Sequence, residues 1–161
     1  SSAASDVYKR QSDICRYLGL KTEIFTPFVC GAFTSLYSKD AVEASFAQGK
    51  IVFFAGGTGH PYFSTDTATV LRAVEIEAEA ILLAKAVDGI YDSDPKTNPN
   101  AVKYDEISIE EVVAKKLAAM DLTASIMCME QKMPMLVFAL DEKDSIINAV
   151  HGKFVGTKVT V

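Results

Sequence analysis

The sequence predicts an α/β protein with a mainly parallel sheet. Short apolar runs alternate with helix-like segments along the chain, and each run has the continuous apolar character of a strand buried on both faces. Strands that alternate with helices imply parallel pairing through right-handed crossovers. Ligands of such sheets bind beyond the carboxyl ends of the strands, so the loops that follow the runs are the candidate sites.

Four apolar runs are expected to form strands. They are TEIFT (22–26), IVFFAG (51–56), AILLAKAV (80–87) and MLVFAL (135–140). The segments between them begin with residues that commonly cap helices. Asp40 with Glu43 forms the pattern of a capping box, and Asp66 and Asp121 each precede a helix-like segment that they are expected to cap.

Composition excludes several classes of protein. The 161 residues are 49% hydrophobic, enough for one buried core or for the larger part of a broken domain. The net charge is −5 and the basic residues are scattered, which argues against nucleic acid and anionic membranes as partners. No apolar run approaches the ~20 residues of a membrane span. Asp6, Lys9 and Arg10 interrupt any secretory signal.

The three cysteines, Cys15, Cys30 and Cys128, have no metal-ligand spacing, and no metal ligand is proposed among the side chains. Inert, buried thiols are the expectation. Thiols of this kind fit a reducing cytoplasm, and a cytoplasmic location is therefore expected.

The first candidate site is the loop AGGTGHPYFSTDTA (55–68) after the second run. Its glycines allow a sharp turn and a close approach to a ligand. Its hydroxyls and the start of the following helix favour an anion, and its two adjacent aromatic side chains suit a flat base or ribose. A glycine turn with a helix cap explains part of this pattern as well. The loop is neither a Walker A loop nor a GxGxxG fingerprint.

The second candidate site is the loop KAVDGIYDSDPKTNP (85–99) after the third run. Tyr91 is suited to stacking on a base, and Asp92 or Asp94 to accepting hydrogen bonds from a ribose or base. Composition alone favours a surface loop of turn-forming residues. Asp121 is likewise explained by helix capping, although a carboxylate at such a helix start can also position lysines or a metal ion.

Longer motifs resemble a known family. The segment FFAGGTGHPYFSTDTATVLRAVEIEAEAILLAKAVDGIYDSDP, then KYDEISIEEVVAKKLAAMDLTA and a closing GT, resembles the bacterial uridylate (UMP) kinases of the amino-acid kinase superfamily, from about residue 12 to residue 161. The resemblance implies a three-layer αβα sandwich with a mainly parallel sheet. It also implies transfer of the ATP γ-phosphate to UMP, with Mg²⁺, to give UDP in pyrimidine nucleotide biosynthesis.

The resemblance assigns roles to individual residues. The UMP loop would consist of Thr58, Gly59, His60, Pro61, Tyr62, Phe63, Ser64 and Thr65. Lys85, Tyr91 and Asp94 stand at positions that contact ATP. Asp66 and Asp121 match carboxylates of the reaction centre, and Asp121 is similar to a residue that holds catalytic lysines in place.

The family's members are typically homohexamers activated by GTP and inhibited by UTP, and some of its positions differ in this chain. His60 stands where Asn is usual, and Lys85 stands where Thr or Asn is commoner. Glu23 and Lys39 replace an Arg and a Trp of the GTP-site pattern, and only Lys50 keeps the charge of its counterpart. GTP activation is therefore left open.

The family's N-terminal features, a Lys-x-Ser-Gly turn and a second glycine loop, have no counterpart before residue 12. Residues 1–11, SSAASDVYKRQ, resemble an in-frame translation of a transposase adapter used for sequencing libraries. We therefore expect residues 12–161 to be the C-terminal part of a single amino-acid kinase domain whose N-terminal part is missing, and to be inactive alone.

Two other interpretations stay open. One is a non-catalytic nucleotide-binding or storage module on the same fold. The other is an amino-acid kinase that acts on a carboxylate or carbamate, and the PYFSTD block weighs against it.

Overall fold

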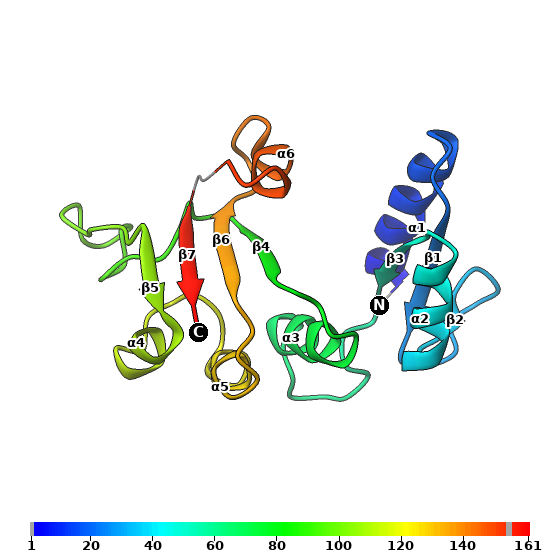
Figure 1. Ribbon diagram of the computed structural model, residues 1–161, viewed down its shortest axis with the longest axis horizontal. Coiled ribbons are helices and arrows are strands. Elements are labelled where there is room, and N and C mark those ends of the chain that lie inside the picture. The colour runs from blue at the N-terminus through cyan, green and yellow to red at the C-terminus, as the bar shows by residue number, and fades with distance from the viewer. Residues whose placement is uncertain (1, 154–155) are drawn as a thin grey trace. The chain divides into compact units, whose positions relative to one another are not determined.

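A computed structural model describes residues 2–153 and 156–161 of the chain. The chain divides into two compact units, Ser1–Thr69 and Val70–Val161, and each contains its own sheet (Figure 1). Helix α3 (Thr65–Glu75) contains the boundary between the units.

The first unit contains a three-stranded sheet in the order β2-β1-β3. Its elements are α1 (Ser2–Tyr17), β1 (Thr22–Thr26), β2 (Ser35–Leu36), α2 (Lys39–Ala47) and β3 (Ile51–Phe54). β1 pairs in parallel with both neighbours. Its side chains Ile24 and Phe25 are buried with Val42 of α2 and Ala55, which follows β3. The sheet is thus covered by apolar contacts with the crossover helix.

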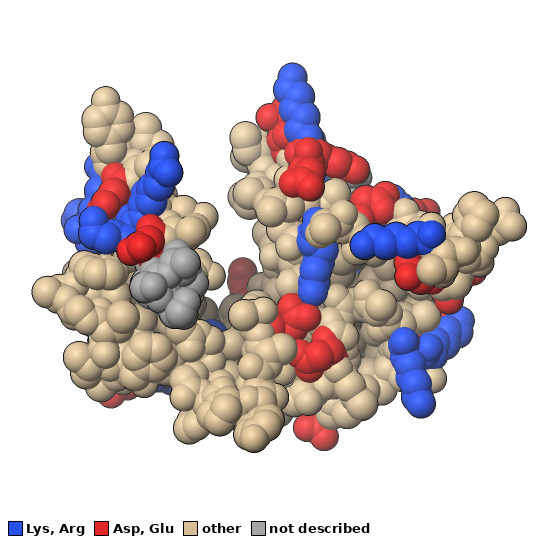
Figure 2. Space-filling model, turned by 180° about the vertical axis from the view of Figure 1, so that it is seen from behind, with Lys and Arg blue, Asp and Glu red and all other residues tan. Residues whose placement is uncertain are grey.

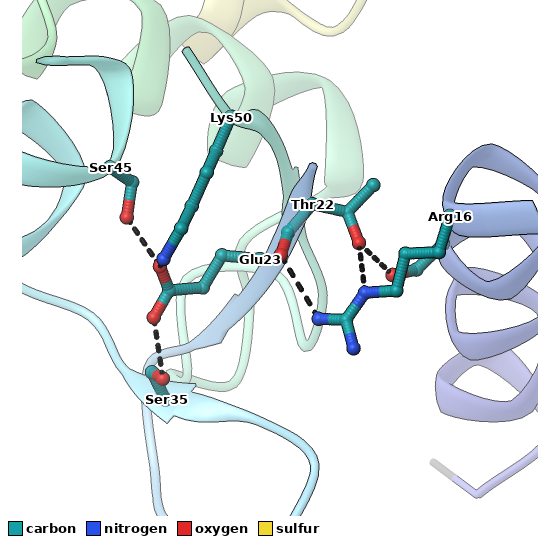
Figure 3. Close-up of polar contacts among 7 residues, drawn as sticks. Arg16, Thr22, Glu23, Ser35, Ser45 and Lys50 are labelled. Carbon is teal, nitrogen blue, oxygen red and sulfur yellow. Dashed lines mark hydrogen bonds and ion pairs between the residues drawn. The ribbon is translucent and has the colours of Figure 1, made fainter. Parts of the chain in front are cut away.

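Polar contacts fix α1 to β1 (Figure 3). Arg16 Nε donates to Thr22 Oγ1 at 2.7 Å, and Arg16 Nη2 donates to the Thr22 carbonyl at 3.0 Å. The hydroxyl oxygens of Ser12 and Thr22, both buried, lie 2.5 Å apart. Helix α1 runs without a break through residues 2–11 and on to Tyr17. The origin of residues 1–11 stays a prediction.

The second unit contains a four-stranded sheet in the order β4-β6-β7-β5 (Figure 1). Its elements are β4 (Ile81–Lys85), β5 (Glu106–Ser108), α4 (Ile109–Ala114), α5 (Leu122–Glu130), β6 (Met135–Ala139), α6 (Ser145–Val150) and β7 (Thr157–Thr160). β4–β6 and β5–β7 are parallel pairs, and β6–β7 is antiparallel. A continuous core joins the sheet to the helices and includes Val70, Ile109, Val112, Val137 and Val159.

The expected α/β class with mainly parallel strands is confirmed, and the strands form two sheets rather than one. All four predicted strands are present, with ends shorter by up to two residues. One cap was assigned wrongly: the N-cap of α2 is Ser38, whose side chain accepts from Ala41 N, and Asp40 lies in the first turn. Ser38 lies two residues before Asp40, and both residue types favour N-caps.

None of the described helices is long and apolar enough to span a membrane. On the face shown in Figure 2, lysine and arginine side chains lie among aspartate and glutamate side chains. This distribution agrees with the scattered basic residues of the sequence.

Candidate functional site

The glycine-rich loop begins directly after β3 in the first unit. Gly56, Gly57 and Gly59 have φ values of 88°, 64° and 79°, a region that residues with a Cβ rarely adopt. A Cβ at Gly56 would lie 3.1 Å from Pro27 Cδ, and one at Gly59 would lie 2.9 Å from Pro27 Cβ. The loop therefore packs closely on the segment after β1. A Cβ at Gly59 would force a neighbour to shift, and one at Gly56 would make an unusually tight contact.

The centre of the loop is held by Thr58 and contains one strained aromatic residue. Thr58 Oγ1 accepts from His60 N at 3.1 Å and lies 3.3 Å from the His60 carbonyl, to which it donates. Tyr62 has φ 72°, and its side chain is fully exposed. A left-handed aromatic residue costs on the order of 1–2 kcal/mol, and such strain is concentrated at ligand-binding sites. Phe63 beside it is also exposed.

The loop ends at the N-terminus of α3. Ser64 Oγ accepts from Thr67 N at 3.1 Å, so Ser64 caps the helix. The expectation that Asp66 is the cap was therefore wrong: the helix begins at Thr65, and Asp66 lies half-buried in its first turn. Negative charge in a first turn is favoured by the helix dipole, which explains a carboxylate there without a capping role.

Lys85 and Asp121 lie at element ends in the second unit. Lys85 is the last residue of β4, and its carbonyl accepts from Leu140 N at 2.8 Å. Asp121 is the N-cap of α5, with Oδ1 accepting from Ala124 N at 2.9 Å, so its predicted capping role is confirmed. Its role in a reaction centre stays a prediction.

The aspartate-rich segment after β4 folds into two arms that run back along each other. Tyr91 and Lys103 form an antiparallel bridge, and Asp92 N donates to the Val102 carbonyl at 3.0 Å. Asp94 lies exposed beyond this pairing, and its Oδ1 accepts from Lys96 N at 2.9 Å. Turn formers therefore do shape this segment, as composition alone favoured, and they also fix the backbone around Tyr91 and Asp94.

Composition indicated only turn-forming residues in the segment 85–99, and the sequence analysis singled out none of Asp88, Lys103 and Thr157. Asp88 accepts from Tyr91 and forms an ion pair with Lys103. The hydrogen bond from Lys103 is the main cause that lowers the pKa of Asp88 below its ordinary value. The hydrogen bond that Tyr91 donates to Asp88 is the main cause that raises the pKa of Tyr91. Lys103 lies fifteen residues after Asp88, too far along the chain for the two to form a local motif.

The sequence-predicted residues thus fall into two sets. The proposed UMP loop, 58–65, forms one continuous structure with Asp66 in the first unit. Lys85, Tyr91, Asp94 and Asp121 lie in the second unit, each fixed by its own backbone or side-chain contacts.

The three residues compared with the family's GTP site also lie in the first unit. Glu23 accepts from Lys50 and from two serines, as Figure 3 shows. Lys39 Nζ lies 3.6 Å from Glu43 Oε1 on the exposed side of α2. Lys50, which alone keeps the expected charge, is therefore ion-paired within the chain. GTP activation, UTP inhibition and a hexameric state stay predictions.

A glycine loop that leads from the carboxyl end of a parallel strand into a helix N-terminus is characteristic of α/β proteins that bind anionic ligands. The chain matches the family model described as the amino acid kinase family over residues 7–139, and it belongs to that family.

Solved structures of similar fold include three kinases. The chain is 33% identical to the UMP kinase of Ureaplasma parvum, with a TM-score of 0.87, 93% of this chain covered and 64% of that one. It is 32% identical to the UMP kinase of Bacillus anthracis, with a TM-score of 0.83 and coverages of 88% and 59%. The chain is 30% identical to the uridylate kinase of Archaeoglobus fulgidus, with a TM-score of 0.65, 80% of this chain covered and 61% of that one. The chain therefore spans less than two thirds of each of these proteins.

Proposed function

We propose that this chain carries the nucleotide sites of a UMP kinase, which transfers the γ-phosphate of ATP to UMP. The observation that carries the proposal is the loop from Gly56 to Ser64, which is held on Pro27, contains the strained Tyr62 and leads into α3. Similarity to three uridylate kinases at 30–33% identity supports the same substrate.

In this proposal the loop binds UMP through residues 58–65. The phosphate lies against backbone N–H groups of the glycine loop and the α3 N-terminus, where the helix dipole favours an anion. The Thr65 hydroxyl supplies a further donor, while the Thr58 and Ser64 hydroxyls hold the loop and the start of α3 in place. Tyr62 and Phe63 are exposed and aromatic, which suits packing against the uracil or ribose.

ATP binds, in this proposal, to the second unit at Lys85, Tyr91 and Asp94, while Asp66 and Asp121 belong to the reaction centre. In residues 2–153 and 156–161 there is no group of three or more His, Cys, Asp or Glu side chains that could hold a metal ion. Mg²⁺ keeps several waters and is commonly bound through substrate phosphates with one or two carboxylates. We therefore propose that Mg²⁺ enters with ATP, and that it neutralises charge on the transferred group.

The test has a binding step and a turnover step. Calorimetric titration of the 161-residue chain with UMP, and with CMP as the matched control, is expected to show preferential binding of UMP. Formation of UDP from UMP and MgATP is then measured for the complete coding sequence of the gene. Transfer to UMP in preference to CMP is the expected result. Nucleotide binding by a complete protein that phosphorylates neither acceptor would instead favour a non-catalytic nucleotide-binding module.

A further inference from the structure

The two carboxylate oxygens of Asp88 have different partners. Oδ1 accepts from the Tyr91 hydroxyl at 2.7 Å, and Oδ2 lies 2.9 Å from Lys103 Nζ. About a third of each charged side chain is exposed, 36% for Asp88 and 30% for Lys103. Because both oxygens are engaged, the carboxylate has a fixed plane, and the hydroxyl end of the Tyr91 ring is fixed with it.

The same segment is anchored at its base by a buried threonine. Thr157 Oγ1 accepts from Ile90 N at 2.8 Å and donates to the Tyr104 carbonyl at 2.5 Å, so it joins the two arms beside Tyr91 and Lys103. Thr157 is fully buried. A Cβ at Gly89 would lie 2.6 Å from Thr157 Oγ1 and 2.9 Å from Lys103 Cδ. The glycine between Asp88 and Ile90 thus leaves the space that the Lys103 stem occupies.

These contacts form a rigid support around one aromatic ring. Tyr91 is bridged to Lys103 through the backbone and to Asp88 through its hydroxyl. An aromatic ring held in this way binds a flat base with less loss of side-chain entropy than a mobile ring. The Asp88 carboxylate therefore links the Lys103 ammonium to the Tyr91 hydroxyl.

We propose that Asp88 and Lys103 are positioning residues for nucleotide binding, and that together they hold the Tyr91 ring in the orientation that receives the ATP base. This inference rests on the proposed function and adds two residues to it. Asp88 and Lys103 act through Tyr91 and do not contact the reacting atoms.

Fluorescent nucleotides test the inference in the 161-residue chain. Affinities for N-methylanthraniloyl-ATP and for the corresponding UMP derivative are measured for the wild type, Asp88→Asn, Lys103→Met and Lys103→Arg. Loss of one charged hydrogen bond is expected to weaken ATP-derivative binding about tenfold in Asp88→Asn and Lys103→Met. Lys103→Arg keeps the ion pair and is expected to restore affinity to about twofold of the wild type. Affinity for the UMP derivative is expected to stay unchanged in all variants.

Glu106→Gln is the matched control. Glu106 forms a more exposed pair with Lys158 in the same unit, at 3.6 Å, and the substitution makes the same chemical change as Asp88→Asn. It is expected to leave both affinities unchanged. A double-mutant cycle of Asp88→Asn with Tyr91→Phe separates positioning from general support, because residues that act through one another have non-additive effects.

The outcomes are distinct. Asp88→Asn and Lys103→Met variants that bind the ATP derivative as the wild type does would overturn the inference while leaving the proposed function intact. Equal weakening for both nucleotides, or additive effects in the cycle, would also overturn it. A wild-type chain that binds neither derivative would contradict the proposed function itself. If Asp88→Asn fails to fold, the comparison of Lys103→Met, which removes the ion pair, with Lys103→Arg, which keeps it, still decides between these results.

Discussion

Lys50 Nζ lies 2.9 Å from Oε2 of Glu23, and the pair is half-buried on the sheet of the first unit. The same carboxylate accepts from Ser45 at 2.5 Å and from Ser35 at 3.0 Å (Figure 3). Glu23 therefore connects β1 with β2, α2 and the residue before β3. The hydrogen bond from Ser45 is the main cause that holds the pKa of Glu23 below its ordinary value of 4.5.

The first prediction is a pH dependence of stability. A carboxyl group whose pKa is lower in the folded chain stabilises the fold above its unfolded pKa, and this contribution is lost as the pH falls through the folded pKa. Glu23→Gln removes the charge. It is therefore expected to lower the free energy of unfolding by about 1–2 kcal/mol at neutral pH, and by progressively less below about pH 4.5. Hydrogen exchange of the peptide containing β1, measured from pH 7 to pH 3 with correction for the intrinsic rate, checks this.

Glu43→Gln is the control for this prediction. Glu43 forms an exposed pair with Lys39 in α2, and such pairs contribute roughly 0–1 kcal/mol. A Glu23→Gln variant whose protection matches that of Glu43→Gln at every pH would contradict the stabilising role of the Glu23 carboxylate.

The second prediction concerns Thr157, which joins the two arms of the segment after β4. Thr157→Val keeps the shape of the side chain and removes the hydroxyl, so Ile90 N and the Tyr104 carbonyl lose their partner. Leaving such buried groups unsatisfied is expected to cost about 1–3 kcal/mol. Thr160→Val, at the half-buried end of β7, is the control. Urea unfolding should separate the two variants clearly, and equal midpoints would show that the hydroxyl of Thr157 does not support the segment.

Long apolar runs made much of this fold predictable. The strand at 135–139 follows from continuous apolar sequence, because a strand buried on both faces leaves no polar alternation. The strand at 22–26 is apolar only at Ile24 and Phe25, and its Glu23 forms polar contacts. β2, β5 and β7 were not predicted, since none contains a continuous apolar run and each is defined by its neighbour in space. Gly156 illustrates this: a Cβ there would lie 2.1 Å from the carbonyl of Val137, a contact that only the folded sheet creates.

The candidate site was predictable where its residues are adjacent in sequence. The glycines and aromatics of the loop at 55–64 are concentrated within ten positions, so their common role could be inferred. Asp88 and Lys103 are fifteen residues apart, and their pairing depends on how the intervening segment turns. The error at Asp66 has a different cause, because Ser64 and Asp66 are both good caps and only the backbone selects between them.

The third prediction concerns thiol reactivity. Cys128 is fully buried in the core of the second unit, and desolvation raises the pKa of its thiol to about 11. Cys15 and Cys30 are half-buried, so the expectation of buried thiols was wrong for these two and is confirmed for Cys128. Because the thiolate is the reactive form, about one Cys128 thiol in a thousand is ionised at pH 8. Ellman's reagent is expected to modify Cys15 and Cys30 in the native chain and Cys128 only in denaturant. Rapid labelling of Cys128 in the native chain, located by mass spectrometry, would contradict its burial.

The last prediction separates two glycines of the proposed UMP loop. Gly57 and Gly59 both have positive φ, so alanine at either position carries a similar backbone cost of roughly 1 kcal/mol. They differ in space, since a Cβ at Gly57 meets nothing within 4 Å and one at Gly59 lies 2.9 Å from Pro27 Cβ. Gly59→Ala must therefore displace the loop from Pro27, and it is expected to weaken UMP binding at least about tenfold. Gly57→Ala is expected to bind UMP with an affinity within about threefold of the wild type.

Calorimetric titration with UMP, run beside thermal unfolding, checks this difference. Matching unfolding temperatures for the two variants would show that any loss of affinity comes from the shape of the loop rather than from global stability. If Gly57→Ala and Gly59→Ala lost affinity equally, contact with Pro27 would not be what sets the geometry of the site. In that case left-handed backbone conformation alone would explain the glycines, and Tyr62, which holds such a conformation with a side chain, would become the residue to substitute next.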